Sequence, residues 1–283
     1  MEINRLSDVL GAEVLGVDVA NVDNETVGLL RQALLDNLIL VFRNQTITPE
    51  EHIRFSERFG ELEIHIATDH LLEGYPKIII VSNKQVDGRF IGAVSAGDHW
   101  HSDLSCKAKP SLGSLLYALE LPEKGGDTEF CNQYRAYETL PKSTKSRIQN
   151  FRGIHTFNRM RNPRVEVPKE HISDAKMRYE DRAPDDAIHP IVRKHPENQR
   201  KLLYVSQRFT IGIEGLPDKE AQPLLDELFS HQLKRDLIYR HVWQPRDIIF
   251  WDNRCTTHFA CRNFSSGQIR HMHRTTIAGD IPN

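Results

Sequence analysis

The sequence feature that most constrains the fold is a set of metal-ligand residues with more than half of the chain between them. Residues 100–103 read Trp-His-Ser-Asp, and on a strand the side chains of His101 and Asp103 would point to the same face. Two ligands do not complete a metal site, and His258, shortly after Trp251-Asp252-Asn253-Arg254, is the best candidate for a third. We therefore expect a fold that returns His258 to His101 and Asp103.

Two His and one carboxylate on one side of a metal leave coordination positions open on the other side. This arrangement is typical of non-haem Fe(II) oxygenases. The same ligands also hold Zn(II) or Mn(II), because the order of metal affinities does not by itself select iron. A metal-dependent hydrolase or isomerase is therefore the alternative, and a non-enzymatic β-sandwich binding protein with a vestigial site is a third.

Other polar residues near these motifs are expected to be structural. The chain contains a second H-x-carboxylate, His195-Pro196-Glu197, in a loop where nothing in the sequence indicates convergence on a metal. Asp252 and Arg254 are expected to form a network that braces the loop carrying His258. The H-x-D spacing alone is therefore a weak signal for a metal site. The candidate third ligand, His258, and the motif before it strengthen the prediction for His101 and Asp103.

The composition is that of an ordinary globular protein. The 283 residues carry a net charge of −2 and are 39% hydrophobic, which excludes a disordered chain or one that coats nucleic acid. No apolar run reaches the roughly 20 residues that cross a bilayer, and the N-terminus lacks the apolar stretch of a signal peptide. The four cysteines form no C-x-x-C motif, which suits a reducing compartment. We expect a cytoplasmic protein without nucleic-acid or membrane partners.

Hydrophobic periodicity predicts many short strands and a few peripheral helices. Thr48-Pro49-Glu50-Glu51 combines an N-cap, a first-turn Pro and a capping-box Glu, so a helix should begin there and end near Gly60. Helices are expected at residues 24–37, 48–59, 134–150 and 218–232. Strands are expected at residues 8–20, 38–42, 78–81, 114–118, 129–131, 188–192, 202–206, 237–243, 248–251 and 272–277.

This pattern favours a mainly β fold of two packed sheets with flanking helices, in a single catalytic domain spanning residues 1–283. Residues 158–186 are rich in Arg, Glu, Asp and Pro and have no clean period. A segment of this length without its own core is usually a functional lid or disordered, so we predict a mobile lid there.

The last strand candidate carries a second chemical signal. In Arg270-His271-Met272-His273-Arg274, a strand would place Arg270, Met272 and Arg274 on one face and the two His on the other. Arginine offers a planar, bidentate fork to carboxylates, so two Arg beside a Met indicate a pocket for anions. For this stretch alone, a solvated basic edge strand is an equally good interpretation.

Four motifs together resemble the TauD/TfdA family of Fe(II)- and 2-oxoglutarate-dependent dioxygenases. The resemblance extends over nearly the whole chain and implies a double-stranded β-helix core, the jelly roll of cupin-like proteins. The motifs are residues 100–103, Gly125-Gly126-Asp127-Thr128, the segment from Trp251 to His258, and Arg270 to Arg274. Further matches are Gly11-Ala12-Glu13, Phe42-Arg43-Asn44-Gln45 and Arg58-Phe59-Gly60-Glu61-Leu62.

The resemblance implies a role for each candidate site residue. His101, Asp103 and His258 would hold Fe(II). Thr128 and Arg270 would anchor the distal carboxylate of 2-oxoglutarate, the co-substrate, whose keto-acid end chelates the metal. O2 would complete the reaction, with succinate and CO2 as products.

The primary substrate implied by the resemblance is a small carboxylate, sulfonate or sulfate. Arg274 and His65 would bind its acidic group, and Phe157 and Phe209 would form aromatic walls. An organic acid is preferred because residues 126–131 resemble the segment in phenoxyacetate-oxidising members. The expected reaction is hydroxylation, with C–O or C–S cleavage after it as a further option, in a homo-oligomer (dimer or tetramer).

Overall fold

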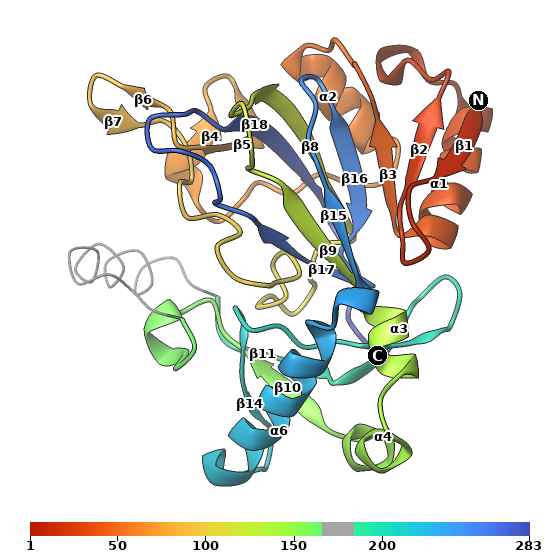
Figure 1. The fold of residues 1–283 in the computed structure, drawn as a ribbon, viewed down its shortest axis with the longest axis vertical. Coiled ribbons are helices and arrows are strands. Elements are labelled where there is room, and N and C mark those ends of the chain that lie inside the picture. Colours follow the sequence, from red (N-terminus) through yellow and green to blue (C-terminus); the bar gives the residue numbers. More distant parts are fainter. Residues whose placement is uncertain (166–183) are drawn as a thin grey trace.

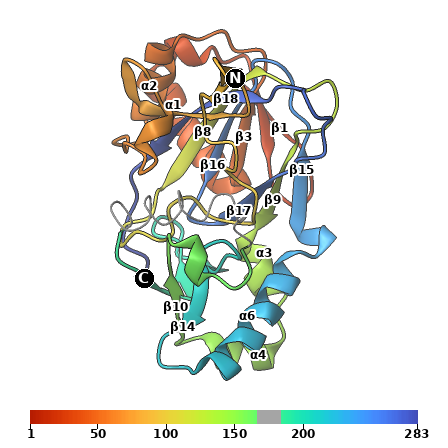
Figure 2. The same cartoon turned by 90° about the vertical axis from the view of Figure 1, so that its left-hand side faces the viewer.

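The structure is a computed structural model that describes residues 1–165 and 184–283. A two-sheet β body occupies the upper part of Figure 1, and a smaller lobe of helices and short strands lies below it. Figure 2 places α1 (Asn24–Asn37) and α2 (Pro49–Glu57) on the outer side of the body. Most of the predicted lid at residues 158–186 lies outside the described residues.

The larger sheet contains eight strands. They are Glu2–Arg5 (β1), Ala12–Leu15 (β2), Ile39–Phe42 (β3), Leu71–Leu72 (β4), Tyr75–Ser82 (β5), Gly113–Glu120 (β8), Ile248–Asp252 (β16) and His271–Ile277 (β18). Their order is β1-β2-β3-β16-β8-β18-β5-β4, and of these pairs only β2 and β3 run parallel. The central strands β16 and β8 are apolar and buried, because the helices cover one side of the sheet and a second sheet covers the other.

The smaller sheet consists of Thr128–Asn132 (β9), Ile238–His241 (β15) and Thr256–Ala260 (β17), in the order β15-β9-β17. A backbone bridge between His101 and His258 adds residue 101 to its open edge. Phe130 from this sheet packs with Trp251 and Met272 from the larger sheet in a shared core. Two largely antiparallel sheets that share this core form the predicted jelly roll.

The helix starts follow the sequence closely. The Asp23 carboxylate accepts a hydrogen bond from the Thr26 amide (2.8 Å) and caps α1. The predicted capping box of α2 is present: the Thr48 amide donates to Glu51 (2.8 Å), and the Glu51 amide donates to Thr48 Oγ1 (3.3 Å). The predicted helix at residues 48–59 ends two residues early, at Glu57. None of the described helices combines the length and apolarity needed to cross a membrane.

The lower lobe packs around one amphipathic helix, α6 (Asp218–Gln232), whose bounds match the prediction. Leu224, Leu225 and Leu228 lie on its buried face. The other elements of the lobe are α3 (Gln133–Glu138), α4 (Lys142–Ile148), β10 (Arg152–His155), β11 (Ala187–Pro190), β12 (Val192–Lys194), β13 (Lys201–Leu203) and β14 (Thr210–Ile213). Elsewhere the chain forms the hairpin of Gln85–Val86 (β6) and Arg89–Phe90 (β7), and 3-10 turns at Val19–Asn21, Thr68–His70, Arg159–Arg161 and Arg235–Leu237.

Several predicted elements are wrong in detail. The strand expected at residues 188–192 divides between β11 and β12, and the strand expected at residues 202–206 ends at Leu203. The helix expected at residues 134–150 is two helices, α3 and α4, because Pro141 disfavours a helical conformation at Leu140 and caps the second helix. The strand pattern expected over residues 8–20 shrinks to β2, which pairs with β1. Gly11 and Gly16 take positive φ angles of 99° and 73° at its two ends, so the extended backbone stops there.

Candidate active site

His101 and His258 face each other across the edge of the smaller sheet. The His101 amide donates to the His258 carbonyl (3.1 Å), and the His258 amide donates to the His101 carbonyl (2.8 Å). Residues paired in this way project their side chains to the same face, and the two ring centroids are 4.1 Å apart. His101 belongs to no regular strand, so the strand considered for residues 100–103 reduces to this single bridge.

Asp103 reaches the same point through a turn, not along a strand. Its Oδ2 accepts hydrogen bonds from Ser114 Oγ (2.8 Å) and Asn253 Nδ2 (3.4 Å). Asn253 Oδ1 also accepts the backbone amide of Asp103 (3.1 Å). These contacts leave Oδ1 facing the imidazoles, 3.5 Å from His101 Nε2 and 3.9 Å from His258 Nε2.

The three side chains fit a metal ion. Their donor atoms all lie within 4.8 Å of one another, and ligand bonds of about 2.1 Å would bring adjacent donors to about 3 Å. His101 Nδ1 lies 2.8 Å from the His99 carbonyl, which can only accept, so the ring proton sits there and Nε2 keeps its lone pair. Burial lowers the pKa of His258 well below its usual value, which keeps this ligand neutral.

Asp103 stays ionised although it is buried. Burial by itself would raise its pKa, but the charge of Arg274, the largest opposing contribution, holds the pKa of Asp103 well below its usual range. The Arg274 contribution is direct, because its Nη1 donates to Asp103 Oδ1 (2.8 Å). An anionic carboxylate beside the neutral His258 imidazole is suited to coordinating a divalent metal.

Arg274 and His65 form a second part of the site. Arg274 is 7% exposed, and its Nε is buried with no hydrogen-bond partner among the described residues. His65 Nδ1 accepts the Ala67 amide (3.0 Å), so its ring proton is on Nε2. Burial, followed by the charge of Arg274, lowers the pKa of His65 to about 3. A cation and a neutral donor therefore lie near Asp103.

Arg270 and Thr128 meet where β18 and β9 begin. Arg270 Nη2 donates to Thr128 Oγ1 (3.3 Å), and its Nε donates to the Gly126 carbonyl (2.9 Å). Burial, followed by the charge of Arg262, lowers the pKa of Arg270 to about 10, so it remains charged at neutral pH. No carboxylate in the part of the chain that is described forms an ion pair with it; the nearby Asp127 pairs with Arg240.

The two predicted aromatic residues, Phe157 and Phe209, both contact Arg208. The Phe209 ring is 6.2 Å from the His101 ring, edge to face. The Arg208 guanidinium lies 4.6 Å from the Phe209 ring and 5.8 Å from the Phe157 ring, and it donates to the Phe157 carbonyl (2.9 Å). Phe209 therefore lies beside the candidate metal ligand His101, and Phe157 is farther away, connected to Phe209 through Arg208.

A second buried cluster, His195, Asp252 and Cys255, also has donor atoms within 4.8 Å. Its carboxylate is already occupied: Arg254 Nε bonds to Asp252 Oδ1 (2.9 Å), and Arg254 Nη2 bonds to Oδ2 (2.6 Å). His195 Nε2 lies 3.1 Å from the same Oδ2. This is the bracing network predicted for the loop that carries His258.

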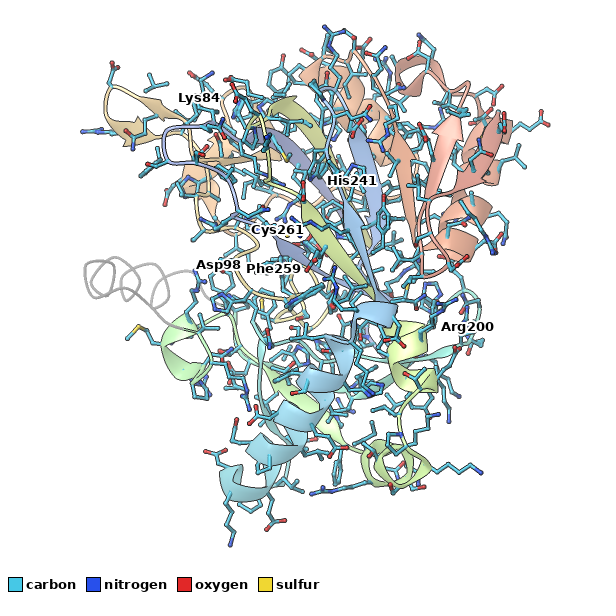
Figure 3. The ribbon with its side chains drawn as sticks, viewed as in Figure 1. Lys84, Asp98, Arg200, His241, Phe259 and Cys261 are labelled. Carbon is cyan, nitrogen blue, oxygen red and sulfur yellow. The ribbon has the colours of Figure 1, made fainter. Side chains whose placement is uncertain are left out.

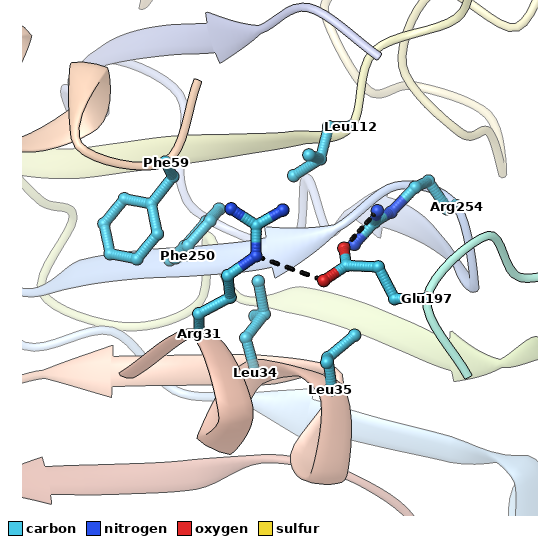
Figure 4. Close-up of a pocket in the computed structure, with 8 residues that line it drawn as sticks. All are labelled: Arg31, Leu34, Leu35, Phe59, Leu112, Glu197, Phe250 and Arg254. Atoms are coloured by element: carbon cyan, nitrogen blue, oxygen red, sulfur yellow. Dashed lines mark hydrogen bonds and ion pairs between the residues drawn. The ribbon is translucent and has the colours of Figure 1, made fainter. Parts of the chain in front are cut away.

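Glu197 extends this network to the outer helix. Its Oε1 accepts from Arg254 Nη1 (2.6 Å) and its Oε2 from Arg31 Nε of α1 (3.1 Å), beside the small pocket drawn in Figure 4. The second H-x-carboxylate of the sequence thus contributes to an ionic brace. The side chain of His195 is fully buried and that of Glu197 is half-buried, although nothing in the sequence predicted a role for this loop.

Sequence reasoning missed three supporting residues. Ser114 and Asn253 hold Asp103, and Trp243 Nε1 donates to Thr128 Oγ1 (3.0 Å). Asn253 belongs to the segment preceding His258, so its position was a signal, but its partner was not predictable. Ser114 lies in a strand that periodicity identified only as core.

The fold and the site define a class of protein. A jelly roll that gathers two His and one carboxylate on one face carries the ligand set of the non-haem Fe(II) oxygenases. The family model described as "Taurine catabolism dioxygenase TauD, TfdA family" matches residues 2–276, and the chain belongs to this family.

Similar proteins agree with this assignment. The α-ketoglutarate-dependent 2,4-dichlorophenoxyacetate dioxygenase of Cupriavidus pinatubonensis is 31% identical, over 98% of this chain and 97% of its own length. An alkylsulfatase of Acinetobacter baylyi is 29% identical, over 99% of this chain and 86% of its own. The crystal structure of a taurine dioxygenase from Burkholderia xenovorans has a TM-score of 0.81 at 31% identity and covers 99% of this chain and 90% of its own.

The chain is therefore an oxygenase that uses α-ketoglutarate, that is 2-oxoglutarate, together with O2. Iron is the typical metal of such enzymes, and the His-Asp-His set is suited to it. The comparisons support this reading and not the metal-dependent hydrolase or isomerase that the ligands alone left open.

Proposed function

We propose that His101, Asp103 and His258 hold Fe(II), and that the distal carboxylate of 2-oxoglutarate binds Thr128 and Arg270. The observation that carries this proposal is the buried Arg270, which has no carboxylate partner among the described residues. A buried cation without a counter-charge is costly, so a site that keeps one is suited to an anionic ligand.

The protein groups orient the reactants and control charge. When bound, the metal would activate O2, which is the oxidant, and oxidative decarboxylation of 2-oxoglutarate to succinate and CO2 would supply two electrons. Ser114 holds the second oxygen of Asp103, so the first stays directed at the metal position. Burial keeps the His258 imidazole neutral and able to act as a ligand, and the buried site residues limit access of bulk water.

We propose that the primary substrate is a small organic anion whose acidic group binds Arg274 and His65. The buried Nε of Arg274 is available for a further acceptor, and His65 offers one Nε2–H donor. Because the pKa of His65 is about 3, this donor is neutral at physiological pH. Phe209 and Phe157 would contact the apolar part of the substrate.

The names of the three similar proteins include a carboxylate, a sulfate ester and a sulfonate, which is the range that one arginine and one imidazole can accept. We favour a carboxylate of an organic acid. The proposed reaction is hydroxylation of a C–H bond. If that carbon also carries oxygen or sulfur, the hydroxylated product collapses and the C–O or C–S bond breaks.

The decisive experiment is anaerobic absorption spectroscopy of the purified protein with Fe(II), before and after 2-oxoglutarate is added. We expect a weak visible charge-transfer band that saturates with 2-oxoglutarate. Arg270→Ala should raise the dissociation constant for 2-oxoglutarate by roughly 10- to 100-fold, because a charged hydrogen-bond donor is lost. Arg152→Ala is the matched control, since Arg152 on β10 is exposed and pairs with Glu214, just after β14, in the lower lobe.

The outcomes separate the two arginines. If Arg270→Ala leaves 2-oxoglutarate affinity unchanged and Arg274→Ala weakens it, the assigned roles are exchanged. If no band forms in the wild-type protein, the metal and co-substrate assignment fails. A panel of carboxylates, sulfonates and alkyl sulfates, each scored by perturbation of the band, then identifies the substrate class.

Two further expectations accompany this function. We infer that residues 1–283 act as one catalytic unit and that the enzyme assembles as a dimer or tetramer. Light scattering of the purified protein measures the assembly directly, and a monomer at working concentration would contradict that expectation.

A further inference from the structure

Thr128 has an unusual hydrogen-bonding environment. Its Oγ1 receives the indole N–H of Trp243 (3.0 Å) and the Nη2–H of Arg270 (3.3 Å). A hydroxyl oxygen has two acceptor lone pairs and one proton to donate. With both lone pairs engaged by donors, the proton of Thr128 is directed to an acceptor outside this group.

Trp243 contacts both residues of the anion site. It is 8% exposed, and its ring lies 5.8 Å from the Arg270 guanidinium carbon. Strand β15 brings it there, because His241 pairs directly with Thr128 across the smaller sheet. His241, labelled in Figure 3, packs edge-on against the Trp243 ring (4.9 Å) and lies 3.2 Å from Asp247 Oδ2. The indole therefore has a fixed orientation.

We propose that Trp243 is a positioning residue that selects a co-substrate with a distal carboxylate. Its N–H occupies one lone pair of Thr128 Oγ1. The hydroxyl proton is thereby turned toward the position that the distal carboxylate of the co-substrate would occupy. Its ring face holds the Arg270 guanidinium in the same place. This inference rests on the proposed function, because it concerns the carboxylate that Thr128 and Arg270 bind.

The alternative is that Trp243 only fills space between the sheets. The two roles differ in one measurable way. A packing role affects every 2-oxo acid that binds the metal, whereas a positioning role affects only those with a distal carboxylate. A 2-oxo acid of equal chain length without that carboxylate, 2-oxovalerate, therefore serves as the internal reference.

The test is the dissociation constant of each 2-oxo acid for the Fe(II)-loaded protein, measured anaerobically by titrating the absorption band. Trp243→Phe removes the N–H and keeps an aromatic ring. We expect 2-oxoglutarate to bind roughly three- to tenfold more weakly, as for the loss of one neutral hydrogen bond, and 2-oxovalerate to bind as in the wild type. Equal weakening of both acids, or of neither, would overturn the proposal.

A double substitution gives a second, independent measurement. If Trp243 acts through the hydroxyl, adding Trp243→Phe to Thr128→Val causes no further loss of 2-oxoglutarate affinity. Additive losses would overturn the proposal even if 2-oxovalerate bound too weakly to titrate. Melting temperatures of all variants establish that each is folded.

Arg270→Ala distinguishes failure of this inference from failure of the proposed function. If Arg270→Ala abolishes the preference for 2-oxoglutarate over 2-oxovalerate while Trp243→Phe preserves it, only the role of Trp243 is wrong. If Arg270→Ala also preserves the preference, the distal carboxylate binds elsewhere and the proposed anchor itself is wrong.

Discussion

The two H-x-carboxylate motifs of this chain, His101-Ser102-Asp103 and His195-Pro196-Glu197, have the same spacing and opposite outcomes. In the first, the carboxylate and both imidazoles of the site converge, with Asp103 Oδ1 facing His101 and His258. In the second, His195 and Glu197 diverge, and Glu197 pairs with arginines. Spacing along the chain therefore does not decide which pair can bind a metal.

The difference lies in the donors that reach the carboxylate beside each His, which is Asp103 for His101 and Asp252 for His195. The neutral side chains of Ser114 and Asn253 donate hydrogen bonds to Oδ2 of Asp103. Arg274 Nη1 donates to Oδ1. Arg254 instead bonds to both oxygens of Asp252. A metal at Asp252 would displace that guanidinium and leave it buried without its partner, which costs several kcal/mol.

The largest expected effect comes from removing the first carboxylate. Asp103→Ala should lower Fe(II) affinity by more than about 100-fold, beyond the usual effect of a supporting residue, and turnover should fall below detection. Metal content after dialysis and 2-oxoglutarate-dependent succinate formation measure this. A variant that kept iron and activity would remove Asp103 from the ligand set.

Removing Asp252, the carboxylate that His195 and Arg254 share, should affect stability instead. Asp252→Asn breaks a buried pair with Arg254, and the free energy of unfolding should fall by about 3–5 kcal/mol. Urea denaturation measures this loss, and metal titration of the folded fraction should give nearly wild-type affinity. If stability were unchanged and iron affinity collapsed, the brace would be a metal site.

Asn253 links the two regions, because its neighbours belong to the brace and its side chain reaches Asp103. Asn253→Ala should weaken Fe(II) binding by roughly 10- to 100-fold, the usual cost of losing a group that orients a ligand. Asn198→Ala is the matched control, since Asn198 bonds to Tyr134 and not to the site. Equal effects of the two substitutions would argue against the link.

The smallest effect is expected at Glu197, whose side chain is 26% exposed. Glu197→Gln should cost about 1 kcal/mol or less in unfolding free energy at pH 7. Burial opposes the shift, but Arg31 and Arg254 lower the pKa of Glu197. The contribution is therefore complete above the unfolded-state pKa, near 4.5, and is lost as pH falls through the lower folded-state value.

Urea denaturation of the Glu197→Gln variant and of the wild type at pH 7 and at pH 3.5 tests that sign. The difference in unfolding free energy between the wild type and the variant should be smaller at pH 3.5 than at pH 7. The reason is that protonation makes the carboxyl neutral, like the amide that replaces it. A difference that grew on acidification would mean that Glu197 is unfavourable in the folded state.

Much of the fold followed from local patterns. The helices at residues 24–37 and 218–232 have the predicted bounds, because their apolar residues repeat with the helical period. Local patterns failed where a single residue changed the outcome. Pro141 divides one predicted helix in two, and the chain turns at Asp103, so His101 forms a bridge and not a strand.

The sequence by itself determined the residue types proposed to do the chemistry, which are the candidate metal ligands and the two arginines near the last strand, and the family to which their order belongs. Only the tertiary structure decided which neighbours those residues have. Asn253 meets Asp103, and Trp243 meets Thr128, across more than a hundred intervening residues. Hydrogen bonds depend on distance and direction in space, whereas periodicity and spacing describe only what lies nearby along the chain.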